Sequence, residues 1–206
     1  KEKYLKPLLN AEIASCYSMT EPQAGADPGE FLCTATRDGD DWVINGEKWF
    51  ASHARFSAFL LVMVVTNPDV PIHEGASIFL VEQGTPGMEI IRNSAVGPYI
   101  EQGDGVHAYI SFKDCRVPAE SLLGNEGQGF HVAQTRLGGG RVHHAMRTVG
   151  VIRRAIDLMC ERALSRRNKG ELLADKQMTQ EKIAYDYTRQ MQYRLHVLYT
   201  AWLIDK

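Results

Sequence analysis

The chain has 206 residues, of which 44% are hydrophobic and 23% charged, a composition typical of a globular protein. No apolar run approaches the roughly 20 residues that a membrane-spanning helix needs, and the first residues lack a signal-peptide pattern. The net charge of −2 hides an asymmetry, because residues 1–128 hold 9 Lys/Arg against 18 Asp/Glu and residues 129–206 hold 14 against 7. The basic half could face phosphates or an acidic neighbour, or form a solvated helix surface. Nucleic acid is a poor fit because no recognition motif is present.

Residues 1–10 read as the end of a helix or a linker, and residues 11–118 predict an all-β domain. About seven short strands separated by turn signals favour a compact barrel or sandwich. The predicted strands are, in order, 14–19, 31–36, 42–44, 59–65, 76–81, 88–91 and 106–112. The 59–65 run is continuously apolar, which indicates a strand buried on both faces. Asp38-Gly39 and Asn45-Gly46 are typical of hairpin turns.

After residue 129 the apolar period changes to steps of three and four, which predicts two amphipathic helices with a break near 168–170. Residues 124–129 look like a phosphate loop but lack its Lys-Ser/Thr, so they indicate a domain linker. A helix over 129–167 would be roughly 58 Å long, longer than the about 45 Å diameter of a globule of this length. We therefore expect uncovered apolar surface that needs a missing part of the chain or another subunit.

Cys16, Cys33, Cys115 and Cys160 are widely spaced, as expected of free thiols in a reducing compartment. His131, His143 and His144 lack the spacing of metal ligands, so no metal site is expected. The chain starts at Lys1 and ends within a helical pattern, which suggests a fragment of a longer protein. The compartment itself is not indicated.

Two predicted strand ends are the first candidate site. The strand before Thr20 stops in a turn through Pro22 and Gly25, and a second strand ends at Ser52 beside aromatic residues. Two adjacent strand ends with hydroxyl groups could hold a heteroaromatic ring, or they could be two solvated hairpin ends.

Four segments in this order resemble the acyl-CoA dehydrogenase family, in the branch of family members ten and eleven. The segments are MTEPQAGAD, INGEKWFAS, FKDCRVPAESLLGNEGQGF and RLGGGRVHHAMRTVG. The resemblance implies an α+β fold, with a β-barrel-like middle domain followed by long helices of an incomplete up-down bundle. It divides the chain into 1–10 (end of an N-terminal helical domain), 11–122 (flavin-binding β-domain) and 123–206 (partial C-terminal helical domain).

The resemblance also implies a site for FAD. The residues that carry over as FAD contacts are Tyr17, Ser18, Met19, Thr20, Phe50, Ala51, Ser52, Arg166 and Gln177. Ser52 replaces the usual threonine, and Phe50 replaces a tryptophan that stacks on the flavin. Trp49 should point the opposite way from Phe50, because side chains alternate along a strand. Arg166 and Gln177 match positions that reach the FAD of a neighbouring subunit, although Lys169 replaces the aromatic residue that often follows.

The acyl-CoA substrate is the implied ligand of a second group of residues. Gly138, Gly139, Gly140 and Arg141 match a segment that borders the substrate, and Ala26 replaces a serine that contacts CoA. Each glycine inside a helix costs roughly 1 kcal/mol relative to alanine, which indicates either close helix packing or a ligand lying against bare backbone. Arg141 supplies a fixed positive charge for a carboxylate or a CoA phosphate.

The implied reaction is α,β-dehydrogenation of acyl-CoA thioesters, as in fatty acid β-oxidation, with electron-transferring flavoprotein as acceptor and a homodimer or homotetramer as the complete form. A carboxylate must act as base. One branch of the family carries it at the position of Gly140, which cannot serve, and most members carry it farther along the C-terminal domain, beyond Lys206. We therefore expect no catalytic base in this chain and no activity of the chain alone. The alternatives are a flavin oxidase or monooxygenase of the same fold, and a truncated, non-catalytic binding module.

Overall fold

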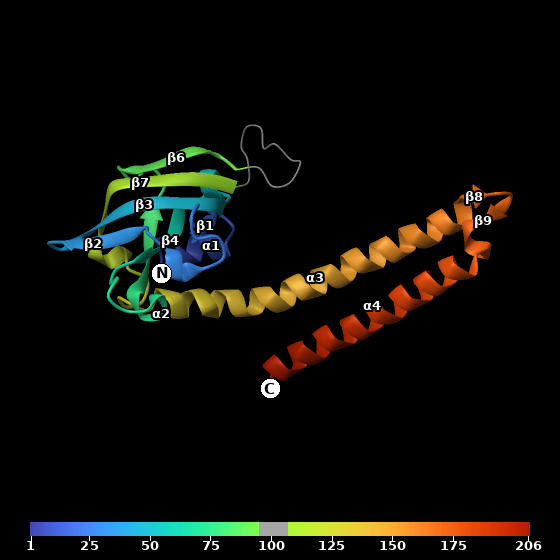
Figure 1. Ribbon diagram of the computed structural model, residues 1–206. Coiled ribbons are helices and arrows are strands. Elements are labelled where there is room, and N and C mark those ends of the chain that lie inside the picture. Colours follow the sequence, from blue (N-terminus) through green and yellow to red (C-terminus); the bar gives the residue numbers. More distant parts are fainter. Residues whose placement is uncertain (95–106) are drawn as a thin grey trace. The chain divides into compact units, whose positions relative to one another are not determined.

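The structure, a computed structural model, describes residues 1–94 and 107–206 (Figure 1). The chain divides into two compact units, residues 1–134 and residues 135–206. A β-sheet forms the first unit, and two long helices dominate the second.

The first unit contains helices α1 (Leu5–Leu9) and α2 (Ile72–Gly75) and strands β1 (Ser15–Ser18), β2 (Thr34–Asp38), β3 (Asp41–Ser52), β4 (Phe59–Val65), β5 (Ala76–Glu82), β6 (Met88–Asn93) and β7 (His107–Pro118). The long helices are α3 (Gly129–Ser165) and α4 (Gln177–Ile204), joined through a small hairpin of β8 (Arg167–Asn168) and β9 (Glu171–Leu172). This arrangement confirms the predicted α+β class, and the predicted helix break lies in the β8–β9 hairpin. Residue 106, where the last strand was predicted to start, lies outside the described residues.

The strands form one sheet in the order β1-β4-β2-β3-β7-β6, and β5 pairs with β4 (Figure 1). β1 runs parallel to β4, whereas β3, β7 and β6 form an antiparallel set. The backbone N–H of Trp49 in β3 donates a hydrogen bond of 2.7 Å to the carbonyl of Thr20, just after β1. Because β4 and β2 separate these strands in the sheet order, this bond shows that the sheet curls. The curl confirms the barrel-like domain.

β4 is the centre of the first unit's core. Its seven residues, FLLVMVV, are all buried except the half-buried Leu61. Alternate side chains serve opposite faces, because successive residues of a strand point to opposite sides of the sheet. Leu60 and Val62 join one apolar cluster, and Met63 and Val65 join another. The prediction of a strand buried on both faces is therefore confirmed.

The turn prediction was right at one glycine and wrong at the other. Asp38 pairs with Asp41 across the β2–β3 hairpin, as predicted. Asn45-Gly46 instead lies inside β3, where the pairing with β7 shifts register. Gly46 has φ 135°, and a Cβ on it would lie 2.6 Å from the Cα of Cys33. The chain does not reverse at Gly46. Glycine is needed because the β-bulge packs closely against Cys33, the residue before β2.

The segment before α3 packs against β5. Leu123 donates its backbone N–H to the Ile78 carbonyl at 2.8 Å, and Gly127 donates to the Ser77 hydroxyl at 2.9 Å. A Cβ on Gly127 would lie 2.5 Å from the Glu74 carbonyl oxygen. The glycines therefore let the backbone of this segment lie close to the backbone around Glu74, just before α3 begins.

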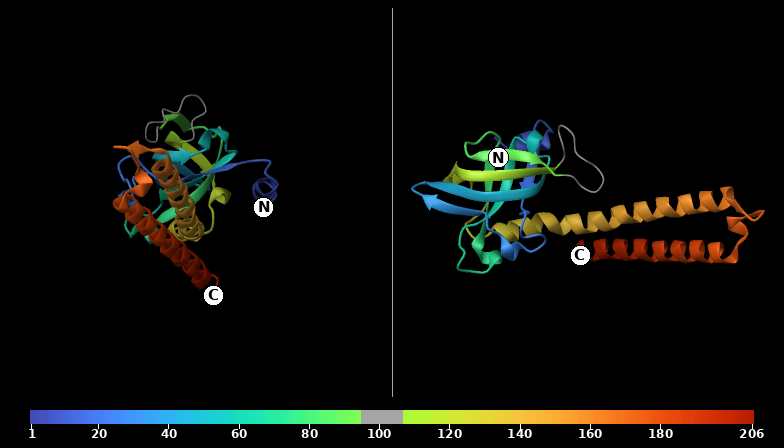
Figure 2. Two further views of the ribbon diagram at one scale, coloured as in Figure 1. Left: turned by 90° about the vertical axis from the view of Figure 1, so that its right-hand side faces the viewer. Right: turned by 45° about the horizontal axis from the view of Figure 1, so that its top comes forward.

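α3 and α4 lie side by side and antiparallel in both views (Figures 1 and 2). α3 has 37 residues, which corresponds to about 55 Å. Its buried residues Val149, Ile156 and Ala163 recur every seven positions, and Gln190 and Val197 of α4 do the same. This spacing is the seam of two long paired helices.

Much of the apolar surface of this helix pair is uncovered, which confirms the expectation from helix length. The exposed large side chains of α3 and α4 are Val151, Leu158, Leu164, Met178, Tyr185, Tyr187, Met191, Leu195, Leu198, Tyr199, Trp202, Leu203 and Ile204. Among the described residues, no helix is both long and apolar enough to cross a membrane.

Candidate functional site

The two strand ends that the sequence singled out lie beside each other. Thr20 follows β1 and accepts the backbone hydrogen bond from Trp49 that the sheet's curl creates. The Thr20 side chain is half-buried, and within residues 1–94 and 107–206 its hydroxyl makes no hydrogen bond. A hydroxyl group is therefore available at the junction of β1 and β3.

The aromatic pair at the end of β3 differs from the prediction. Trp49 and Phe50 do not point to opposite sides, because their rings stack with centroids 4.6 Å apart. The β3–β7 register shifts between Lys48 and Ala51, so these two residues form a bulge that interrupts the alternation. Phe50 has φ 53°, a left-handed conformation that is an outlier for a bulky residue.

Phe50 is 39% exposed, whereas Trp49 is half-buried. The Trp49 indole N–H donates to the hydroxyl of the buried Ser94. Backbone strain of this kind costs about 1–3 kcal/mol and concentrates at ligand sites. The bulge thus presents an aromatic face to solvent at a local energetic cost.

Ser52, at the end of β3, is joined to the neighbouring strand by its side chain. Its hydroxyl lies 2.9 Å from Nδ1 of His107 in β7. His107 also meets the edge of the Phe50 ring, with centroids 6.2 Å apart. Either atom of the Ser52–His107 contact can donate, and if Nδ1 carries the proton, the Ser52 hydroxyl hydrogen remains available to an acceptor.

The remaining candidate residues on these strands differ in what they can offer a ligand. Ser18 and Ala51 are fully buried, so their side chains face the core and only their backbones can reach a ligand. The Ser18 hydroxyl has no hydrogen-bond partner in the described part of the chain. Tyr17 and Met19 are half-buried and pack against the second apolar cluster.

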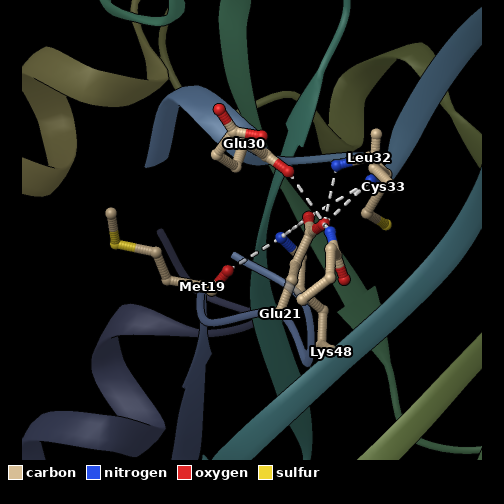
Figure 3. Close-up of polar contacts among 7 residues, drawn as sticks. Met19, Glu21, Glu30, Leu32, Cys33 and Lys48 are labelled. Carbon is tan, nitrogen blue, oxygen red and sulfur yellow. Dashed lines mark hydrogen bonds and ion pairs between the residues drawn. The ribbon is translucent and has the colours of Figure 1, made fainter. Parts of the chain in front are cut away.

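Sequence reasoning missed a buried ion pair directly behind the strand ends (Figure 3). Lys48 Nζ lies 2.8 Å from Glu21 Oε1, and the two side chains are 0% and 1% exposed. Lys48 also donates to the carbonyl of Met19 at 2.8 Å. The available signal was weak, because a Glu after one strand and a Lys within another, 27 residues apart, normally indicate solvated positions.

The Glu21 carboxylate is surrounded by donors. Its Oε2 accepts from the Leu32 backbone N–H at 2.7 Å and from Gln23 Nε2 at 2.7 Å, and the Cys33 N–H reaches both oxygens at 3.2 and 3.3 Å. Only an ionised carboxylate, which is an acceptor at both oxygens, satisfies all of them. Burial lowers the pKa of Lys48, and the negative charge of Glu21 opposes that shift.

The residues expected at the substrate lie in other places. Ala26 is exposed in the turn after β1, and Gly138, Gly139, Gly140 and Arg141 form one stretch of α3. A Cβ added to any of the three glycines would meet no described atom within 4 Å. Close packing within the described chain therefore does not account for them.

Arg166 and Gln177 flank the β8–β9 hairpin at one end of the helix pair (Figure 1). The carbonyl of Arg166 accepts a hydrogen bond from the Leu173 N–H at 2.9 Å, and both Arg166 and Gln177 are exposed. The structure therefore brings these two positions to the same end of the second unit. Lys169, in the hairpin turn, has φ 53°.

No cluster of three or more potential metal-ligating side chains occurs among the described residues. The four cysteines are free, and burial raises the pKa of Cys33 to about 12 and that of Cys115 to about 11. A raised pKa keeps the Cys33 and Cys115 thiols protonated at neutral pH, and the thiol is a weaker nucleophile than the thiolate.

Comparison with known proteins assigns the chain to a family. The model of the acyl-CoA dehydrogenase middle domain matches residues 16–115, and that of the acyl-CoA dehydrogenase C-terminal domain matches residues 127–206. The chain belongs to the acyl-CoA dehydrogenase family. This confirms the resemblance stated from four segments of the sequence.

Individual relatives agree. The chain is 42% identical over its whole length to the probable acyl-CoA dehydrogenase FadE2 of Mycobacterium tuberculosis, of which it covers 51%. It is 44% identical over 81% of its length to human acyl-CoA dehydrogenase family member 11, of which it covers 22%. A solved Mycobacterium abscessus structure assigned as an acyl-CoA dehydrogenase superimposes with a TM-score of 0.91 at 37% identity, covering 100% of this chain and 51% of that one.

The chain thus spans about half, or less, of the length of these relatives. Their names indicate an oxidoreductase of the acyl-CoA dehydrogenase type, and the family implies a flavin cofactor. The strand ends fit such a group, because the partly exposed Phe50 lies in the bulge bonded to Thr20, whose hydroxyl makes no hydrogen bond within residues 1–94 and 107–206.

Proposed function

We propose that residues 1–206 provide the flavin site and part of the substrate site of an FAD-dependent acyl-CoA dehydrogenase. The observation that supports this proposal is the backbone hydrogen bond of 2.7 Å from Trp49 to Thr20, which joins the end of β1, with its hydroxyl residue, to the β3 bulge, with its partly exposed Phe50. Flat heteroaromatic rings bind where an apolar face and a few fixed polar groups converge.

Each residue of this junction has a distinct proposed role. Phe50 covers one face of the flavin ring, with less area than a tryptophan would offer. Thr20 and Ser52 provide hydroxyls for the polar edge of the ring, while Ser18 and Ala51 contribute backbone groups only. When bound, the flavin supplies the acceptor for the hydride that leaves the β-carbon of the thioester.

The second unit is proposed to contribute residues to substrate binding and to subunit assembly. The glycines 138–140 allow a thioester or acyl chain to lie directly against the backbone of α3, and Arg141 offers a positive charge to CoA phosphate. Arg166 and Gln177 reach the FAD of a neighbouring subunit, where a guanidinium suits the pyrophosphate. This role requires a homodimer or homotetramer.

We assign no general base within residues 1–206, because the position that carries it in one branch is Gly140. The full-length protein must therefore supply a carboxylate for removal of the α-proton. Residues 1–206 alone are expected to bind ligands without turning over an acyl-CoA, and electron-transferring flavoprotein is the proposed acceptor.

The test uses the full-length protein under anaerobic conditions. Titration with saturated acyl-CoA thioesters of increasing chain length should bleach the absorbance of the oxidised flavin and release the enoyl-CoA. Electron-transferring flavoprotein should then reoxidise the protein faster than air does. Faster reoxidation by oxygen would identify an oxidase, and no bleaching by any thioester would overturn the proposal.

A further inference from the structure

The buried Glu21–Lys48 pair has no contact with solvent and no role in the proposed chemistry. Taking two charges out of water is costly, and a pair of well-packed apolar side chains usually stabilises a core at least as well. Core packing alone therefore does not explain why Glu and Lys, and not apolar residues, are buried here. We look for the explanation in the segments that the pair connects.

The pair connects three separate pieces of the chain (Figure 3). Lys48, in β3, donates to the carbonyl of Met19 at the end of β1. Glu21, directly after Thr20, accepts the backbone N–H groups of Leu32 and Cys33, which lead into β2. An apolar pair could fill the same volume but could not fix the positions of these backbone groups, because apolar contacts have no direction.

The location of the pair matches the two strand ends. Lys48 is the last β3 residue in register before the bulge, and Trp49 next to it donates its N–H to Thr20. Glu21 is the residue after Thr20. The ammonium group also lies 4.3 Å from the centroid of the buried Phe31 ring, an additional attraction for the positive charge. The groups that β1 and β3 are proposed to offer the flavin, Thr20, Phe50 and Ser52, are thus within four residues of the pair.

We propose that Glu21 and Lys48 are positioning residues: their buried ion pair holds the end of β1 against the β3 bulge and so sets the geometry in which Thr20 and Phe50 meet a flavin. The part concerning flavin rests on the proposed function, whereas the part concerning the strand ends does not. Loss of a purely stabilising pair would lower the stability of the whole first unit equally. Loss of a positioning pair would weaken the Trp49–Thr20 hydrogen bond in particular.

The experiment compares four variants of the full-length protein. Lys48→Met and Glu21→Gln each remove one charge and leave the other buried, so both lower the melting temperature. The double variant E21Q/K48M removes both charges with little change of volume, and should regain most of that loss. Arg116→Met is the matched control, because it breaks exposed ion pairs with Asp38 of β2 and Asp41 at the opposite end of β3.

Two readouts are taken well below each melting temperature: hydrogen exchange of the Trp49 amide, and the Kd for FAD added to the apoprotein. The double variant should exchange the Trp49 amide at least about tenfold faster than the wild type and bind FAD at least about tenfold more weakly, despite its recovered stability. Arg116→Met should change neither.

If the double variant has the wild-type exchange rate and the wild-type Kd, the proposal is overturned, and the ion pair only stabilises the fold. Faster exchange with an unchanged Kd would overturn its flavin part. If the wild type binds no FAD at all, the proposed function fails, and the exchange of the Trp49 amide still decides whether the pair holds the strand ends.

Discussion

At the scale of single residues, Phe50 combines a left-handed φ of 53° with an exposed fraction of 39%. Glycine at this position removes the backbone strain, worth about 1–2 kcal/mol, but loses ring contacts worth about 0.5–1.5 kcal/mol and the burial of the covered part of the side chain, worth about 1–2 kcal/mol. Phe50→Gly should therefore lower the free energy of unfolding by no more than about 2 kcal/mol, while FAD affinity falls about tenfold. Urea denaturation and FAD titration measure the two effects.

Ala11→Gly is the control for that variant, because Ala11 is exposed and has φ 56°. It relieves similar strain without touching the strand ends, so FAD affinity should not change. A loss of several kcal/mol in Phe50→Gly, as when a buried phenylalanine is truncated, would show that the ring belongs to the core and not to a ligand site.

The buried thiols predict how stability depends on alkaline pH. The pKa of Cys33 is raised by burial to about 12 and that of Cys115 to about 11, from an ordinary thiol value of 9.0. The unfolded chain loses these protons first, so the contribution to stability is complete below pH 9 and is lost as the pH rises through 11 to 12.

The double variant C33A/C115A isolates this effect. Between pH 9 and pH 11 the wild type should lose about 1 kcal/mol per pH unit per thiol relative to the variant. Urea denaturation at three pH values in this range provides the measurement, and parallel curves for the two proteins would contradict it.

At the scale of elements, the glycines of α3 separate helix stability from ligand contact. Gly139 and Gly150 both have open space where a Cβ would lie. Gly139→Ala and Gly150→Ala should each raise the free energy of unfolding by up to about 1 kcal/mol, because alanine favours the helix. Only Gly139→Ala should weaken acyl-CoA binding to the full-length protein, measured by calorimetry. Equal affinity of the two variants for acyl-CoA would show that residues 138–140 do not contact the substrate.

The elements also show what a sequence can and cannot predict. β4 and the two long helices were predicted correctly, because a seven-residue apolar run and a period of three and four depend only on local pattern. Asn45-Gly46 was mistaken for a turn, because a glycine with positive φ serves a bulge as well as a reversal. Bulge positions depend on the partner strand.

The sequence predicted that the two strand ends are adjacent, but not the geometry of the residues they carry. Trp49 and Phe50 stack because β3 pairs with β7 out of step, and β7 lies about 60 residues further along the chain. Glu21 and Lys48 meet because the sheet curls, which no local pattern encodes. Such long-range pairings set the geometry that individual motifs leave open.

At the scale of the whole molecule, the uncovered apolar surface of α3 and α4 predicts association. A 23.1 kDa chain with this many exposed large apolar side chains on two helices should not remain monomeric. Residues 1–206 alone should show a sedimentation coefficient that rises with concentration.

The variant Leu195→Glu/Trp202→Glu should reduce this association, because both side chains are exposed on α4. Arg194→Glu, a charge reversal at an exposed neighbouring position, is the control and should retain it. A constant monomer mass for the unmodified chain at every concentration would contradict the expectation.

The most direct test is a crystal structure of the full-length protein with FAD bound. The isoalloxazine ring should lie against Phe50, with Thr20 and Ser52 within hydrogen-bond distance of its polar edge and the Glu21–Lys48 pair intact behind it. A flavin bound elsewhere, with the ends of β1 and β3 covered by another part of the protein, would contradict the account.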